Sequence, residues 1–395
     1  MSAFKNGGSF VIIKNRTLRY GAIQGFYWMS YVAVIGYSSV YLLHVGFDNS
    51  QVGLLIAVTG LLAALFQQVL AGYADRRGGA PLKKMICCIA GVSLACIGGA
   101  WLTQSHKLLT GFLFGSCMVV LLLNIPLVNA LGVATVNGGE KLNFGISRSF
   151  GSMGSAAAGF LLGMVTNRYG AGSVPLCIGA VLALLLLSTA AYPKVAKSGE
   201  AQEAQGSVTD FLRRYPRFCL VLVGLVLLYI SHAVLNNFNY QVVTYMGGDS
   251  ANMGVSMALV AIFELPPMFL FGWMQKKRPV SFWFRLSSIF YVLKNMGTLL
   301  CKGIPAYYAV QLLQMGGFAV QTVSSAFYVN SIMAPGDRVK GHACYAMTLT
   351  MGNVLGALVA GRILDNRGVP AMLAFGLVCS LAGAALLLAF TEKAE

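Results

Sequence analysis

The chain has 395 residues, of which 57% are hydrophobic and 10% carry a formal charge. An average soluble domain has about 25% charged residues, so this composition excludes an ordinary soluble protein. In a soluble protein, the formal net charge of +16 would favour a nucleic-acid partner. The positions of the basic residues, described below, exclude that explanation.

Twelve long apolar segments follow one another along the chain. Because about 20 apolar residues cross the roughly 30 Å hydrocarbon core of a bilayer, each segment predicts a membrane-spanning helix. The sequence therefore predicts an all-α membrane protein with twelve transmembrane helices in two six-helix bundles. In chain order the segments are residues 18–44, 51–73, 84–104, 108–136, 146–167, 171–192, 217–246, 253–274, 280–301, 305–333, 342–363 and 370–391.

The basic residues gather on one side of these spans. With twelve spans both chain ends lie on the same side; that side holds 21 Lys and Arg residues, and the opposite loops hold five. This asymmetry is the positive-inside bias, so we expect both termini to be cytoplasmic. The expected location is a plasma membrane, the inner membrane in a bacterium, and no nucleic-acid partner is expected.

A polar stretch divides the spans into two sets of six. We expect an N-terminal bundle over 1–192, a cytoplasmic linker over 193–216 and a C-terminal bundle over 217–395. The halves also share a spacing of small and polar residues. Gly154 is followed at +9, +13 and +16 by Gly163, Asn167 and Gly170, and Gly352 is followed at the same intervals by Gly361, Asp365 and Gly368. This match, offset by 198 residues, predicts an internal duplication with parallel topology.

The formal charges inside the apolar segments that matter most are Arg148, Glu264 and Lys294. A charge at bilayer depth costs at least about 2.5–3.5 kcal/mol, so these residues predict a functional site facing a water-filled interior. Glu264 lies about 11 residues from either end of its segment, too far to reach either surface. Burial favours its protonated form unless Arg148 or Lys294 pairs with it, and this suits proton coupling. Arg148 and Lys294 could alternatively extend toward lipid headgroups.

Several segments also carry polar stripes at helical spacing. For any single residue, a hydrogen bond between helices is the simpler explanation. Together the stripes predict a solvated cavity for a hydroxylated or mixed polar–aromatic solute, with His232 either a bonded core histidine or a proton relay. The stripe residues predicted to contact the solute are Gln24, Tyr27, Tyr31, Asn129, Asn236, Asn237 and Gln314. Pro266 and Pro267, close to Glu264, predict a weakened helix there.

Three motifs resemble a known family. Residues 74–78 (ADRRG) resemble the G-x-L-A-D-R-x-G loop of the major facilitator superfamily. Residues 144–152 (FGISRSFGS) resemble the F-G-x-x-R-x-F-G segment of lactose permease and its relatives, and residues 261–265 (AIFEL) resemble its G-E-L segment. The resemblance covers the whole chain in span count and is to the branch of oligosaccharide/proton symporters and phenylpropionate-type permeases.

This resemblance implies the major facilitator fold, with Asp75, Arg76 and Gly78 in a cytoplasmic gating loop. It implies that Arg148 and Glu264 bind the solute and that Lys294 lies near a residue involved in proton movement.

The chain departs from the family where the proton mechanism resides. Asn129 replaces an acid, Asn236 and Asn237 stand where the permease has aspartates, and residues 313–317 (LQMGG) replace L-H-M-F-E. The family's proton mechanism therefore does not transfer intact. If protons are coupled, Glu264 must serve both solute and proton, or His232 must assist.

We therefore predict a monomeric secondary transporter for a small organic solute, either a sugar or an aromatic or other organic acid, coupled to protons. The alternative is an uncoupled facilitator, an exchanger or an efflux pump for amphipathic compounds; a membrane sensor or scaffold ranks last. The nine cysteines show no metal-ligand spacing, and H-E-x-x-H, G-x-S-x-G and phosphate-cradling motifs are missing from the sequence. We expect no metal, no cofactor and no enzymatic activity.

Overall fold

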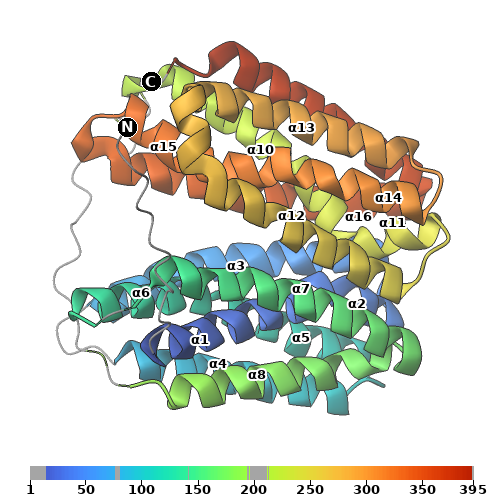
Figure 1. Ribbon diagram of the computed structural model, residues 1–395. Coiled ribbons are helices and arrows are strands. Elements are labelled where there is room, and N and C mark those ends of the chain that lie inside the picture. Colours follow the sequence, from blue (N-terminus) through green and yellow to red (C-terminus); the bar gives the residue numbers. More distant parts are fainter. Residues whose placement is uncertain are drawn as a thin grey trace, which may run out of the picture.

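The structure is a computed structural model that describes residues 15–75, 81–140, 142–193, 195, 211 and 213–393. The described residues form helices and connecting turns without a β-strand, which confirms the predicted all-α class. Figure 1 shows two stacked bundles, one containing α1–α8 and the other α10–α16.

The first bundle is interrupted at two of its spans. A π-helical turn separates α1 from α2, and a single residue separates α5 from α6. Its elements are α1 (Asn15–Tyr31), η1 (Val32–Gly36), α2 (Ser38–Val45), α3 (Asn49–Asp75), α4 (Leu82–Leu102), α5 (Lys107–Leu122), α6 (Asn124–Asn137), α7 (Phe144–Tyr169), η2 (Ala171–Ser173) and α8 (Val174–Ala190).

The second bundle is interrupted at the equivalent places, between α10 and α11 and between α14 and α15. Its elements are α10 (Pro216–Asn237), α11 (Asn239–Tyr245), α12 (Ser250–Lys277), α13 (Val280–Leu300), α14 (Ile304–Gln311), η3 (Leu312–Gln314), η4 (Met315–Ala319), α15 (Val320–Ile332), η5 (Pro335–Asp337) and α16 (Arg338–Phe390). Within α16, Gly368 has a φ of 75° and joins two of the predicted spans, a backbone geometry that glycine adopts readily.

Eight helices of the described chain are long and apolar enough to cross a membrane, or nine if the bent pair α1–α2 is one span. α16 contains two predicted spans. The two that fall short are α13, which carries Arg285 and Lys294, and the broken segment α14–α15. Both occupy the predicted ranges, so the twelve predicted segments all have helical counterparts.

One of the four interruptions has a direct cause in the sequence. Pro126 has no N–H, so it cannot bond the carbonyl of Leu122 one turn earlier, and its ring disfavours a regular helix there. The helix breaks at Leu123, and Gln67 of α3 donates a hydrogen bond of 2.8 Å to the unpaired Leu122 carbonyl. A neighbouring helix thus satisfies the polar group that the proline exposes, as a membrane interior requires.

Pro266 and Pro267 both lie inside α12. α12 continues through both residues as one helix, Ser250–Lys277. The two prolines therefore do not break the helix at Glu264, and the weakening of α12 stays a prediction. The nearest interruption is in the neighbouring segment, at η3 and η4.

The two bundles contact each other mainly through the pairs α7–α12 and α3–α16. We call the end where α1 begins and α16 finishes the inner end, and the opposite end the outer end; the inner end lies to the left in Figure 1. Both crossings lie toward the outer end. A Cβ atom on Gly163 would lie 2.7 Å from the Ser250 carbonyl oxygen, and one on Gly361 would lie 2.5 Å from that of Asn49. Glycine is needed at both crossings because the partner backbone leaves no room.

The duplicated spacing also recurs in packing within each bundle. A Cβ atom on Gly154 would overlap the Gly25 backbone of α1, and one on Gly352 would overlap Tyr229 of α10. α7 and α16 therefore each use one glycine to approach the first helix of their own bundle and a second to approach the other bundle.

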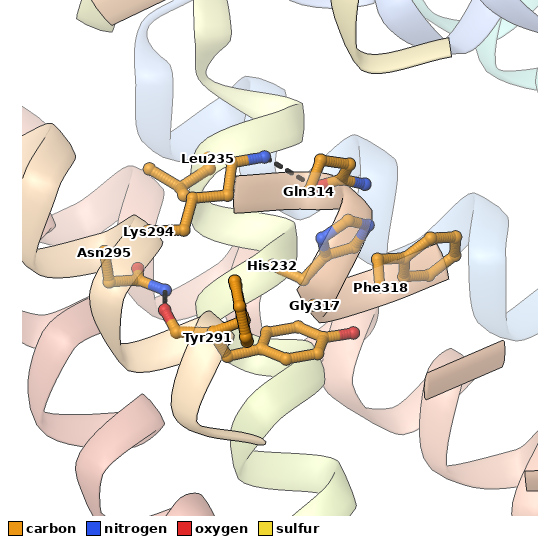
Figure 2. A pocket seen from close by; sticks show the side chains of 9 residues that line it. His232, Leu235, Tyr291, Lys294, Asn295, Gln314, Gly317 and Phe318 are labelled. Atoms are coloured by element: carbon orange, nitrogen blue, oxygen red, sulfur yellow. Dashed lines mark hydrogen bonds between the residues drawn. The ribbon is translucent and has the colours of Figure 1, made fainter. Parts of the chain in front are cut away.

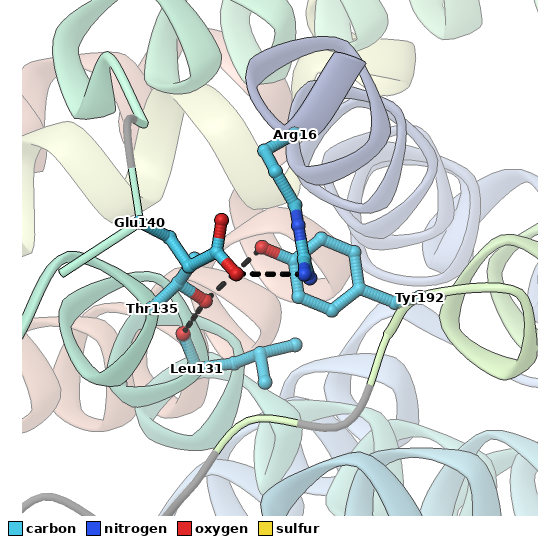
Figure 3. Close-up of polar contacts among 5 residues, drawn as sticks. All are labelled: Arg16, Leu131, Thr135, Glu140 and Tyr192. Carbon is cyan, nitrogen blue, oxygen red and sulfur yellow. Dashed lines mark hydrogen bonds and ion pairs between the residues drawn. The ribbon is translucent and has the colours of Figure 1, made fainter. Parts of the chain in front are cut away.

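A third repeated feature is an ion pair at the inner end of each bundle. Arg16 Nη2 lies 2.8 Å from Glu140 Oε1 (Figure 3), and Arg214 Nη1 lies 2.7 Å from Asp337 Oδ2. Arg16 and Arg214 are themselves 198 residues apart. Each pair ties the start of its bundle's first helix to the connection after the fourth span.

Candidate functional site

The interrupted segments carry most of the predicted site residues. Interrupted helices at corresponding positions of two repeats are where membrane transporters place their solute and ion sites. Here the interruptions fall in the first and fourth span of each bundle. Two polar groups result. We call Tyr20, Gln24, Trp28, Asn129 and Arg148 the N-terminal cluster, and His232, Glu264, Tyr291, Lys294 and Gln314 the C-terminal cluster.

The C-terminal cluster joins two opposite charges through one amide. Lys294 Nζ donates a hydrogen bond of 2.6 Å to Gln314 Oε1, and Gln314 Nε2 donates one of 2.7 Å to Glu264 Oε1. Figure 2 shows the Lys294 amine directed at the Gln314 side chain. Lys294 is 6% exposed, so it does not extend to the lipid headgroups. Of the partners considered from sequence for Glu264, Lys294 is the one linked to it, and the link runs through Gln314.

Only one orientation of the amide satisfies both neighbours. An ammonium group donates and a carboxylate accepts, so the amide oxygen must face Lys294 and the amide nitrogen must face Glu264. Gln314 is the last residue of η3, directly before the π-helical turn η4. The interruption of the tenth span therefore positions the residue that links the two charges.

His232 has partners other than the charged residues. Its ring stacks on Phe318 with centroids 4.4 Å apart and planes 2° apart, and Asn236 Nδ2 lies 2.6 Å from His232 Nε2. A cavity of about 10 Å³ lies between His232, Tyr291 and Lys294, room for about one water molecule. Its lining comprises His232, Leu235, Phe290, Tyr291, Lys294, Asn295, Gln314, Gly317 and Phe318, most of which Figure 2 labels.

The N-terminal cluster is built around an amide of α1. Gln24 Nε2 donates to Tyr20 Oη at 2.7 Å and to Asn129 Oδ1 at 3.3 Å, while Trp28 Nε1 donates to Gln24 Oε1 at 3.2 Å. These bonds join α1 to α6 and fix the plane of the Trp28 indole. The predicted site residues Gln24 and Asn129 thus lie together.

Arg148 lies against the indole of this cluster. Its guanidinium carbon is 5.4 Å from the centroid of the Trp28 ring, and its side chain is exposed. The ion pairs of the described residues are Arg16–Glu140 and Arg214–Asp337, so Arg148 has no carboxylate partner within that part of the chain. The resemblance to lactose permease places an acid at residue 129, where this chain has Asn129.

Two tyrosines complete this surface. Tyr27 is 1% exposed, and its hydroxyl has no hydrogen-bond partner among the described residues. Tyr31 is half-buried, with its ring centroid 5.2 Å from that of Trp28. The rings of Trp28, Tyr27 and Tyr31 therefore pack as one aromatic group beside Arg148.

Other predicted residues are not members of either cluster, and of these Asn236 contacts a cluster residue. Asn237 Nδ2 donates to Asn353 Oδ1 at 2.9 Å, a bond between α10 and α16. Asn236 is exposed and contacts His232. Of the predicted gating loop, Arg76 and Gly78 lie outside the described residues, and Asp75 is the last residue of α3.

Sequence reasoning missed three relevant residues. Trp28 lies four residues after Gln24, so the helical stripe that named Gln24 could have found it. Asn353 follows the duplicated Gly352. Tyr291 lies one turn before Lys294 and, at 4% exposed, has a hydroxyl without a partner among the described residues.

Comparison with known proteins gives the family. The model of the MFS_1 like family matches residues 20–375. Sugar efflux transporter A of Dickeya chrysanthemi is 24% identical over 344 residues, 85% of either chain. A putative sugar efflux transporter of Deinococcus radiodurans is 27% identical over 130 residues, so the match spans about a third of that relative.

Solved structures show the same fold. A point mutant of the nucleoside transporter NupG superposes with a TM-score of 0.80 at 16% identity, over 95% of this chain and 99% of that one. A POT family transporter bound to a thioalcohol-conjugated peptide gives a TM-score of 0.72 at 11% identity, over 94% of each chain. Because the family model covers most of the sequence, the chain belongs to the MFS_1-like family and is a multi-pass major facilitator superfamily transporter of a small-molecule solute, not an enzyme.

Proposed function

We propose that this transporter couples the movement of a small polar organic solute to the movement of protons, with Glu264 as the coupling carboxylate. The observation that carries the proposal is the Lys294–Gln314–Glu264 chain of hydrogen bonds. Every other Asp or Glu in the described chain lies at a helix end, in a loop or at the bend of α16. Glu264 therefore offers its carboxyl at a depth that no other described acid reaches.

The amide bridge links protonation to helix position. An ionised Glu264 accepts a charge-assisted hydrogen bond from Gln314, and such bonds are roughly twice as strong as neutral ones. Protonation weakens that bond and leaves Lys294 without a nearby negative charge. Because an uncompensated charge at this depth costs at least about 2.5–3.5 kcal/mol, protonation favours a new arrangement of α12, α13 and the segment α14–α15.

The movement itself is proposed to be a rocking of two units, residues 1–192 and 217–395, joined by the linker 193–216. Among the described residues, the hydrogen bonds between the two units lie at the outer end, from Asn49 and Ser50 to Asp365 and from Gln241 to Asn49. With both termini cytoplasmic in the plasma or bacterial inner membrane, this arrangement corresponds to the inward-facing state. One chain contains both clusters, which supports a monomer as the working unit.

The direction of transport has two candidates that use the same carboxylate. Import with protons follows from the resemblance to lactose permease, where the counterparts of Arg148 and Glu264 bind the sugar. Efflux in exchange for protons is supported by the two relatives, both named sugar efflux transporters. The replacement of the family's tenth-span acid by residues 313–317 (LQMGG) leaves Glu264 to carry the proton in either direction.

The proposal is tested in proteoliposomes that contain a pH-sensitive dye. Sugars, nucleosides and organic acids are applied to wild type, to Glu264→Gln and to Glu140→Gln, a control that removes a carboxylate from the inner-end ion pair. We expect one solute class to drive a proton signal that Glu264→Gln reduces at least tenfold and Glu140→Gln leaves within twofold. Solute flux without a proton signal in wild type would overturn the coupling and leave a facilitator or exchanger.

A further inference from the structure

We infer that the transported solute carries an anionic group and that Arg148 binds it beside the aromatic surface of Trp28. The inference rests on the proposed transport function and names the class of its substrate. It starts from the distribution of charge between the two clusters, which the function alone does not explain.

The C-terminal cluster is electrically balanced within the protein. Lys294 and Glu264 are one positive and one negative charge, joined through Gln314 by bonds of 2.6 and 2.7 Å. A neutral solute could enter this region without leaving a charge uncompensated. The Lys294 ammonium already donates to Gln314, and Glu264 lies one bond further on, so Lys294 offers an anionic solute less than an uncompensated cation would.

The N-terminal cluster is not balanced. Arg148 is its only formal charge, and the neighbouring position that would hold an acid in lactose permease holds Asn129, which accepts a bond from Gln24. The phenols of Tyr20 and Tyr27 lie close enough to Arg148 to interact with it electrostatically, but a neutral phenol does not cancel a charge. Among the described residues no carboxylate pairs with Arg148, and an anionic group on the solute would compensate its charge.

The geometry also leaves Arg148 accessible. The guanidinium rests over the Trp28 ring at 5.4 Å and the side chain is exposed. A planar guanidinium that stacks on an aromatic face retains its N–H edge for a two-bond contact with a carboxylate or a phosphate. The Tyr27 hydroxyl, buried beside it without a described partner, supplies a further donor.

The rest of the solute is defined by the rings around Arg148. Trp28 and Tyr31, with centroids 5.2 Å apart, present apolar faces that suit a sugar or aromatic ring. Arg148 lies 11 residues from Gly159 along α7, and Glu264 lies seven residues beyond Met257 along α12, where these helices cross. At 1.5 Å per residue the two charges lie about 16 and 10 Å along their helices from the crossing. The class is a ring compound with one oxyanion.

The test compares matched neutral and anionic ligands on detergent-purified protein, by ligand-induced thermal shift and by counterflow in liposomes. The pairs are glucose with glucuronate, glucose with glucose 6-phosphate, and benzyl alcohol with benzoate. The carboxylate and phosphate arms distinguish the two oxyanions. The proteins are wild type, Arg148→Gln, Arg148→Lys and the control Arg168→Gln, which removes an exposed arginine at the outer end of the same helix.

We expect wild type to prefer one anionic member over its neutral partner by at least tenfold. Arg148→Gln should abolish that preference, Arg148→Lys should retain part of it, and Arg168→Gln should leave it unchanged. A preference for the neutral members, or an anion preference that persists in Arg148→Gln, would overturn the inference.

The readouts separate this inference from the proposed coupling, because thermal shift and counterflow do not depend on net proton movement. A neutral solute that drives proton flux would uphold the coupling and refute the anionic class. Loss of anion binding in Arg148→Gln without any proton flux in wild type would uphold the anionic class and refute the coupling.

Discussion

The two bundles share one scaffold but treat the charges within their spans in opposite ways. The C-terminal bundle compensates Lys294 with Glu264 through Gln314, whereas the N-terminal bundle leaves Arg148 over Trp28 with Asn129 nearby. The bundles also differ in charge at the outer end. The C-terminal bundle has Asp365 at the position that corresponds, 198 residues earlier, to Asn167 of the N-terminal bundle. Duplication therefore supplies equivalent helices, and differences in charge at a few positions give each bundle its own task.

The largest effect is expected where the bundles are still alike. Gly163→Leu and Gly361→Leu should each reduce transport more than tenfold, because a side chain would meet the Ser250 or Asn49 backbone and force the outer crossings apart. The halves should then open at the outer end. A cysteine introduced at Gln241 in a cysteine-free background should become reactive to a membrane-impermeant maleimide.

The control for this pair is Gly91→Leu in α4, where a Cβ atom would meet nothing within 4 Å. It should leave transport and labelling close to wild type. If Gly163→Leu opens the outer end and Gly361→Leu does not, the two crossings are not equivalent. The idea that both halves hold the outer end closed by the same glycine contact would then be wrong.

The next effect separates the bundles. Gln314→Leu should reduce proton-coupled transport about tenfold, because it removes the amide between Lys294 and Glu264 and leaves both charges without their buried hydrogen-bond partner. Gln314→Glu should restore a partner for Lys294 but place two carboxyl groups together, so coupling should remain impaired. Initial rates of solute-driven proton movement measure both.

Gln68→Leu in α3, an exposed glutamine, is the matched control and should keep at least half of the wild-type rate. A fully active Gln314→Leu protein would show that the bridge does not take part in coupling.

A smaller effect is expected at Asp365, whose carboxylate accepts bonds of 3.2 and 2.8 Å from Asn49 and of 2.6 and 2.5 Å from Ser50. Four donors from the other bundle converge on one carboxylate at the start of α3, where a helix N-terminus favours negative charge. Asp365→Asn should raise maleimide labelling at the outer end two- to fivefold. Asn167→Asp, the exchange at the repeat position, should leave labelling unchanged; equal changes in both variants would remove the proposed difference between the halves.

The smallest effect is expected at the inner-end ion pairs. Surface ion pairs contribute about 0.2–1 kcal/mol, so Arg16→Gln and Arg214→Gln should each lower Tm by only a few degrees and change transport less than twofold. Arg16 should matter more, because its guanidinium also lies 6.0 Å from the Tyr192 ring centroid and Thr135 holds the Tyr192 hydroxyl at 3.0 Å (Figure 3). A larger shift for Arg214→Gln would contradict this order.

Hydropathy was sufficient to predict the fold, because membrane spans are set by length and composition. It could not predict where helices break. Pro126 does mark a break, but Pro266 and Pro267 lie in a continuous helix, and the breaks at Phe238 and at η3–η4 contain no proline. Such breaks depend on partners in other helices, which a single segment does not reveal.

For the candidate site, the sequence could identify the polar side chains within apolar segments but not their contacts with one another. Glu264, Lys294 and Gln314 were all named from sequence, but their order as an amide bridge depends on how three helices meet. Asn237 carries the same polar signal and instead bonds Asn353. Pattern alone cannot separate a polar group that serves the solute from one that holds two helices together.

The most direct test of the central claim compares uphill solute accumulation with counterflow in the Glu264→Gln variant. Accumulation requires the carboxyl to take up and release a proton in each cycle, whereas counterflow requires only solute binding and the rocking movement. The account predicts that Glu264→Gln loses accumulation while counterflow persists. Accumulation that survives in Glu264→Gln would contradict the assignment of Glu264 as the coupling carboxylate.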